Sequence, residues 1–107
     1  MTETESLSAT FSTEVLDPPT ALSASAALLF RVNLSWAATV DVRATGYRVL
    51  RGTTSGGPYS QIATIGSRTT TTYQDTVPLT GRYYYVLQST FDSWTSVNSN
   101  EASVLAV

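Results

Sequence analysis

The stretch Phe30-Arg31-Val32-Asn33-Leu34-Ser35-Trp36 decides the fold class, together with Gly46-Tyr47-Arg48-Val49-Leu50-Arg51 ten residues later. Both stretches alternate apolar with polar side chains, which is the pattern of a β-strand that buries one face. The second stretch places Tyr47 and Val49 toward the core. The first predicts a central strand with four inward apolar residues, namely Phe30, Val32, Leu34 and Trp36.

Similar strand patterns recur along the rest of the chain at intervals of about ten residues, which is the spacing of a β-sandwich or barrel. Two prolines after Asp17 mark the start of the folded part, and three glycines in residues 52–58 indicate a loop with positive φ angles. The predicted strands are residues 20–26, 30–36, 46–51, 59–65, 70–74, 83–89 and 98–105. In residues 83–89 the alternation places four side chains inward, those of Tyr83, Tyr85, Leu87 and Ser89.

Composition supports an all-β domain. The chain has 107 residues, which is the size of one domain. Apolar residues make up 42% and charged residues only 13%, whereas Thr and Ser number 18 and 14. Thr, Val and Tyr suit a pleated sheet, and Lys, a good helix former, is absent.

Charge and apolar patterning exclude several classes of partner. The net charge is −2, and the six basic residues, all Arg, form no cluster, so the sequence predicts no nucleic-acid binding. No apolar stretch reaches the roughly 20 residues that span a bilayer. Cysteine is absent, so neither disulfides nor thiolate metal sites support the fold.

The side chains that usually perform catalysis are missing. The chain has no His, Cys or Lys, so a serine triad lacks its base, a zinc site its usual ligands and a Schiff base its amine. Four acidic residues are expected in separate turns or at strand ends, which does not favour a catalytic carboxylate pair: Asp41, Asp75, Asp92 and Glu101. We therefore expect neither an enzyme nor a bound cofactor or metal.

Several motifs in the right order resemble those of a fibronectin type III domain of bacterial or phage type. They are LSW at 34–36, GYRVLRGTTSGGPYSQIATI at 46–65, TTTTYQDT at 69–76 and YYYVLQS at 83–89. The resemblance covers residues 18–105 and implies a seven-stranded antiparallel, immunoglobulin-like β-sandwich. It also implies that Trp36 is the core tryptophan, and that Tyr83 is the corner tyrosine whose hydroxyl bonds to nearby backbone. Members of this family serve as spacers, adhesion modules and partner-binding surfaces.

Residues 1–16 precede this match and also alternate, which divides the chain into an N-terminal arm at 1–16 and the sandwich at 17–107. Ser8, Thr10, Ser12 and Glu14 alternate with apolar residues of the arm, so the arm is either an extra strand or a flexible acidic tail. As a strand, it would dock by strand addition to a sheet edge of its own domain or of a neighbour. Its docking side chains would be Leu7, Ala9, Phe11 and Val15.

Four aromatic residues form a second candidate site. Phe91 and Trp94 flank a predicted turn, and with Tyr59 and Tyr84 they would form an aromatic surface for a sugar ring or a protein. The alternative is that these rings only pack the hairpin.

Together these features favour a non-catalytic structural or adhesive protein-interaction module in an extracellular, cell-surface or virion assembly. Its partner would be copies of itself or a larger assembly. The alternative is an accessory carbohydrate-binding or spacer module of a secreted bacterial enzyme.

Overall fold

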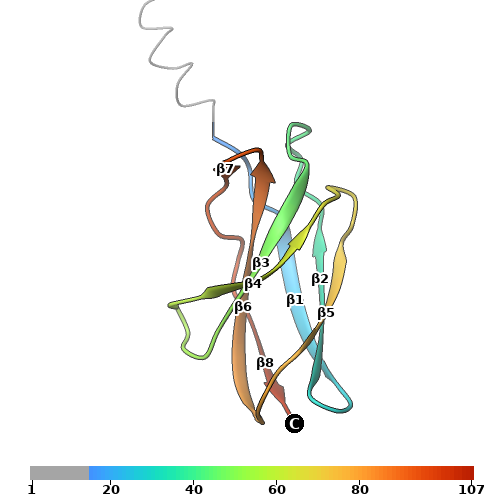
Figure 1. Ribbon diagram of the computed structural model, residues 1–107, viewed down its shortest axis with the longest axis vertical. Helices are drawn as coiled ribbons and strands as arrows, with labels where there is room; N and C mark the ends of the chain where they lie inside the picture. The colour runs from blue at the N-terminus through green and yellow to red at the C-terminus, as the bar shows by residue number, and fades with distance from the viewer. Residues whose placement is uncertain (1–14) are drawn as a thin grey trace, which may run out of the picture.

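The computed structural model describes residues 15–107, which form eight β-strands and no helix (Figure 1). Seven of these strands overlap the seven predicted ranges, and β7 was not predicted. Leu7, Ala9 and Phe11 of the predicted docking strand lie outside the described residues. The strands are β1 (Thr20–Ala27), β2 (Arg31–Ala37), β3 (Gly46–Gly52), β4 (Ser60–Ile65), β5 (Thr72–Thr76), β6 (Gly81–Phe91), β7 (Trp94–Thr95) and β8 (Ala102–Ala106).

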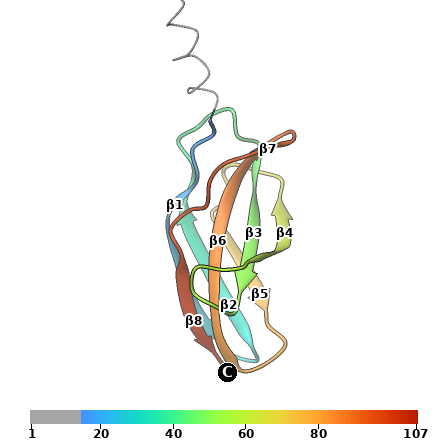
Figure 2. The same ribbon diagram turned by 90° about the vertical axis from the view of Figure 1, so that its left-hand side faces the viewer.

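The strands form two antiparallel sheets that face each other (Figure 2). One sheet has the order β1-β2-β5. In the other, β4 pairs with β3 and β3 with β6, while β7 and β8 pair with opposite halves of the long strand β6. This arrangement confirms the predicted all-β antiparallel sandwich.

The core lies between the sheets and contains the predicted inward residues of β2, β3 and β6. Val32, Leu34 and Trp36 are at most 6% exposed, and each such side chain contributes about 1.5–3 kcal/mol on burial. The rings of Trp36 and Tyr47 meet edge to face, with centroids 5.7 Å apart, a favourable aromatic geometry. The four residues predicted to face inward from β6, Tyr83, Tyr85, Leu87 and Ser89, are all buried.

The hydroxyl of Tyr47 also fixes two loops at the edge of this core. It accepts a hydrogen bond from the N–H of Thr39 at 3.0 Å and donates one to the carbonyl of Arg68 at 2.6 Å. The loop after β2 and the loop before β5 are therefore joined through one buried side chain.

The inward position predicted for Phe30 is wrong. Phe30 precedes β2 and lies in the turn of residues 28–30, where its side chain is 40% exposed. Leu29 and Phe30 have φ angles of 65° and 64°, which lie in the left-handed region, outside the range of regular β-strand. The N–H of Phe30 donates to Val107 O at 3.1 Å, and its carbonyl accepts from Val77 N at 2.8 Å. The predicted strand begins one residue too early, because the alternation of apolar and polar residues continues into the turn and does not reveal it.

The position predicted for Asp75 is also wrong. β5 begins and ends two residues later than predicted, so Asp75 lies inside a strand rather than in a turn. Its carboxylate is tolerated there because Arg51 and Tyr85 both donate hydrogen bonds to it.

The last strand begins at Ala102, four residues later than predicted. The preceding segment still follows β6, but through side chains: Ser99 Oγ accepts from Leu87 N at 2.9 Å, and Ser96 Oγ accepts from Ser89 N at 2.8 Å. Two serine hydroxyls therefore satisfy β6 donors that a regular strand would pair with carbonyls.

Candidate functional site

The chain joins the sandwich at Val15, at the end of the molecule that carries β7 (Figure 1). Leu16 is 2% exposed, and the carbonyl of Asp17 accepts hydrogen bonds from the hydroxyls of Thr39 and Ser89, both at 2.7 Å. Val15 itself is 58% exposed. The segment that follows the predicted arm is therefore bonded into the sandwich.

An ion pair supports this junction. Arg43 Nη2 lies 2.8 Å from Asp41 Oδ2 and also donates to the carbonyl of Val15 at 3.1 Å. The hydrogen bonds from the Arg43 side chain hold the pKa of the Asp41 carboxyl far below its usual range. Asp41 therefore stays ionised, and the pair persists, at any pH near neutral.

The four aromatic residues predicted to form one surface lie in two separate places. Phe91 and Trp94 pair across the hairpin of β6 and β7, with ring centroids 5.9 Å apart in edge-to-face geometry, and Trp94 is 42% exposed. Tyr84 lies seven residues earlier on β6, about 23 Å away at the usual strand rise. Tyr59 lies near Tyr84, because its ring approaches Gly52, the β3 residue that pairs with Tyr84.

Tyr59 belongs to a loop that crosses the outer face of the five-stranded sheet. This loop, residues 53–59, leaves β3, and three of its groups bond to Glu101, which precedes β8 (Figure 2). Ser55 Oγ donates at 2.7 Å and Gly56 N at 2.8 Å, and the hydroxyl of Tyr59 donates as well. Because β6 lies between β3 and β8, the loop must pass over β6. We call residues 53–59 the strap.

The carboxylate of Glu101 is the anchor of the strap. The hydrogen bond from the N–H of Gly56, followed by those from Tyr59 and Ser55, lowers the pKa of Glu101. The hydrogen bond that the Tyr59 hydroxyl donates to Glu101 also raises the pKa of Tyr59, because this bond favours the neutral phenol. The strap is therefore held by an ionised carboxylate at neutral pH.

A buried polar network joins the two sheets below the strap. Asp75 Oδ2 on β5 accepts from Arg51 Nη1 of β3 at 2.8 Å and from Tyr85 Oη of β6 at 2.7 Å. Burial, assisted by the bond to Asp75, raises the pKa of Tyr85. Burial alone would lower the pKa of Arg51, but the hydrogen bond and charge of Asp75 raise it overall. The guanidinium also lies 5.6 Å from the ring centroid of Tyr83, within the range of a cation–π contact.

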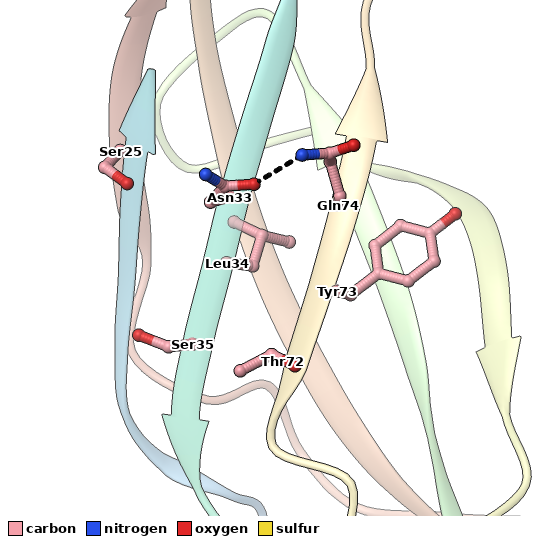
Figure 3. Close-up of a pocket in the computed structure, with 7 residues that line it drawn as sticks. All are labelled: Ser25, Asn33, Leu34, Ser35, Thr72, Tyr73 and Gln74. Carbon is pink, nitrogen blue, oxygen red and sulfur yellow. Dashed lines mark hydrogen bonds between the residues drawn. The ribbon is translucent and has the colours of Figure 1, made fainter. Parts of the chain in front are cut away.

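The outer face of the three-stranded sheet carries a hollow of about 430 Å³ (Figure 3). Cross-strand neighbours place Ser25, Asn33 and Gln74 in one row, and the Gln74 amide donates to Asn33 Oδ1 at 2.8 Å. The hollow is lined by Ser25, Asn33, Leu34, Ser35, Thr72, Tyr73 and Gln74. Amides and hydroxyls exchange hydrogen bonds but are not acids or bases near neutral pH. The alternating polar residues of β2, together with those of β5, are the sequence signal that could have indicated this face.

These arrangements supply hydrogen-bonding and aromatic groups that can bind a partner. Within residues 15–107, no group of three or more acidic residues is placed to hold a metal ion. The same residues include no helix long and apolar enough to cross a membrane. The buried carboxylate of Asp75 accepts hydrogen bonds from Arg51 and Tyr85, and both are side chains of the network between the sheets.

Comparison with solved structures identifies the family. An Fn3-like protein from Clostridium thermocellum is 38% identical in sequence, with a TM-score of 0.72, over 87% of this chain and 95% of that one. The chain belongs to the fibronectin type III family. Two structural features agree with this assignment: the Tyr83 hydroxyl donates to the Leu79 carbonyl at 2.8 Å as a corner tyrosine, and Trp36 lies in the core.

More distant structures share the fibronectin type III fold. Domains A168–A170 of titin are 20% identical with a TM-score of 0.70, over 87% of this chain and 33% of theirs. A β-1,2-glucanase from Parabacteroides distasonis is 18% identical with a TM-score of 0.70, over 86% of this chain and 13% of its own. No protein-family model and no curated protein matches the sequence. The fold is therefore present as a module both in enzymes and in structural proteins, and it is generally non-catalytic.

Proposed function

We propose that this fibronectin type III domain is a non-catalytic structural or adhesive module that joins proteins in an extracellular assembly, on a cell surface or a virion. Its N-terminal arm, residues 1–16, is the docking element and adds as a strand to the sheet edge of a protein partner. The apolar residues Leu7, Ala9, Phe11 and Val15 fill pockets beside that edge.

The observation that carries this proposal is the way the base of the arm is fixed. The buried side chain of Leu16 and the two hydroxyls bonded to the Asp17 carbonyl tie the chain to β6 and to the loop after β2. A force on a docked arm would therefore pass directly into the sandwich core. A flexible tail requires no such attachment, whereas an element that links two proteins does.

The domain also offers edges at which a strand can be added. Beside β1 and β8, the side-chain amide of Asn100 accepts from the N–H of Leu22 and donates to its carbonyl, both at 2.9 Å. On the other side, β4 and β5 each pair with a single strand among the described residues. Edges of this kind accept strands from another chain, so copies of this protein are suitable partners for the arm.

Light scattering and negative-stain microscopy test this role of the arm. The full chain is compared with a variant that begins at Val15, because a cut further along would remove the buried Leu16. We expect the assemblies of the full chain to disappear on truncation. Phe11→Asp should have the same effect, whereas Ser12→Asp, which adds the same charge at the opposite position of the alternation, should not. Equal behaviour of these two variants would contradict strand docking.

A carbohydrate-binding or spacer module of a secreted enzyme is the alternative, and the exposure of Trp94 favours it. The indole is 42% exposed beside Phe91, and indole faces stack on sugar rings through their apolar surface. Under this alternative, Trp94→Ala abolishes polysaccharide binding in calorimetry, whereas Val97→Ala, at another exposed apolar residue, leaves it unchanged. The absence of binding by the full chain would reject the alternative.

A further inference from the structure

The exposed large apolar side chains of residues 15–107 gather toward the two ends of the sandwich, except for Val97, which follows β7 in the segment that bonds to Ser89 and Leu87 of β6. We call the end with β7 the upper end and the end with Val107 the lower end. The upper group consists of Val15, Val40, Val42 and Trp94. The lower group consists of Leu28, Leu29, Phe30, Leu79, Leu105 and Val107. Apolar groups concentrated in this way mark contact surfaces rather than random exposure.

The turn between β1 and β2 shows that the lower group is not a requirement of folding. Leu29 and Phe30 have positive φ angles, a conformation that Gly or Asn adopts with much less strain. Leu28 and Leu29 are nevertheless 85% and 72% exposed. The turn therefore combines backbone strain with solvent-exposed leucines, and neither stabilises the isolated domain. A surface that these side chains contact would account for both.

Acidic side chains without an ionic partner outnumber basic ones at the upper end, where Arg68 is the basic residue, and the lower end has basic ones. Asp17 and Asp92 lie at the upper end, and Arg31 and Arg82 lie at the lower end, where β2 and β6 begin. Within residues 15–107, the ion pairs are those of Asp41 with Arg43 and of Asp75 with Arg51, so none of these four has an ionic partner. Arg68, also near the upper end, donates to the Thr39 carbonyl at 3.1 Å. Contact between two upper ends would bring like charges together, whereas an upper and a lower end attract.

From these three observations we propose that separate copies of this chain stack end to end, with the upper end of one copy against the lower end of the next. The apolar groups form the centre of the contact and the Asp and Arg side chains its rim. A contact between two different surfaces of identical copies is heterologous and produces an open chain. This inference rests on the proposed structural role, but it uses residues outside the arm.

Sedimentation of the full chain from micromolar to millimolar concentration, at low and high salt, tests the stacking. We expect reversible association that high salt weakens. Leu29→Asn is the decisive variant, because Asn tolerates positive φ and the substitution removes an exposed leucine. It should raise the melting temperature and yet weaken association about tenfold or more. The control Ser25→Glu, on an outer sheet face, should associate like the wild type.

Charge exchange tests the direction of stacking. The upper variant Asp17→Arg/Asp92→Asn uses Asn because Asp92 has a φ of 52°, and the lower variant is Arg31→Glu/Arg82→Glu. Each variant alone should associate more weakly than the wild type, and an equimolar mixture should recover association, because each altered end then meets an opposite charge. A monomeric wild type, an effect of Leu29→Asn no larger than that of the control, or a mixture without recovery would each overturn the proposal. All of these variants keep residues 1–16 unchanged, and Asp17→Arg alters only the side chain of a residue whose backbone carbonyl holds the base of the arm, so failure of stacking is distinct from failure of arm docking.

Discussion

Arg51→Met should destabilise this domain strongly through the buried network around Asp75. The Asp75 side chain is only 8% exposed and that of Arg51 23%. Breaking a buried ion pair by removing one partner costs about 3–5 kcal/mol, because the remaining charge stays desolvated. Tyr85 still donates a hydrogen bond to Asp75, and Arg51 is partly exposed, so we expect a value near the lower limit, about 3 kcal/mol. The melting temperature should then fall by about 12 °C or more.

The comparison with other substitutions identifies the cause of this loss. Tyr85→Phe removes one hydrogen bond to a charged group and should cost about 2 kcal/mol. The triple variant Arg51→Met/Asp75→Leu/Tyr85→Phe replaces the whole network by apolar side chains and should lie within about 1 kcal/mol of the wild type. Urea unfolding of the wild type and the variants provides the free energies of unfolding. A cost below about 1 kcal/mol for Arg51→Met would refute the reasoning, because water would then screen the pair. A triple variant as unstable as Arg51→Met would mean that lost packing, not an unpaired charge, causes the effect.

Three further predictions concern single groups. The pKa of Glu101 is lowered in the folded chain, so the stability that Glu101 gives to the strap is complete above its ordinary pKa and is lost as pH falls through the lowered value. Hydrogen exchange at the Gly56 amide should therefore accelerate in strong acid. In the variant Glu101→Gln, the same amide should exchange faster than in the wild type at neutral pH. Tyr47→Phe leaves the Thr39 N–H and the Arg68 carbonyl without their shared partner, and it should lower the free energy of unfolding in urea by about 2 kcal/mol. The control Tyr84→Phe, at a partly exposed position of β6, should lower it by less than about 0.5 kcal/mol. Because the pKa of Tyr85 is raised above its ordinary value of 10, its contribution to stability is complete below pH 10 and declines above it. Titration of phenolate absorbance should show that Tyr85 and Tyr59, whose pKa values are both raised, ionise above that ordinary value.

The sequence predicts the sandwich well because alternation reports directly which face of a strand is buried. Val32, Leu34 and Trp36 were placed correctly for this reason, as were Tyr83, Tyr85 and Leu87. Phe30 was misplaced because a turn with positive φ at Leu29 carries no Gly or Asn signal. Asp75 was misplaced because a carboxylate suggests a turn unless its partners are known, and Arg51 and Tyr85 are 24 and 10 residues away in the chain.

The candidate sites were harder to predict because they depend on which strands become neighbours. Phe91 and Trp94 are three residues apart, and their contact follows from a local hairpin. Tyr59 and Glu101 are 42 residues apart, and only the order β3-β6-β8 brings the strap to its anchor. The clustering of exposed apolar residues at two ends likewise requires the direction of every strand, which alternation does not provide.

The two hydrogen bonds between the side-chain amide of Asn100 and the backbone of Leu22 have a mechanical consequence. β1 and β8 run in the same direction, since β1 starts at the upper end and β8 finishes at the lower end (Figure 2). Tension applied at Val15 and Val107 therefore pulls β1 upward and β8 downward past each other. The two bonds of the Asn100 amide and the β6–β8 ladder are then loaded in shear, so they must break together rather than one after another. Asn100, a residue outside every strand, is placed to determine how much tension the domain withstands before it unfolds.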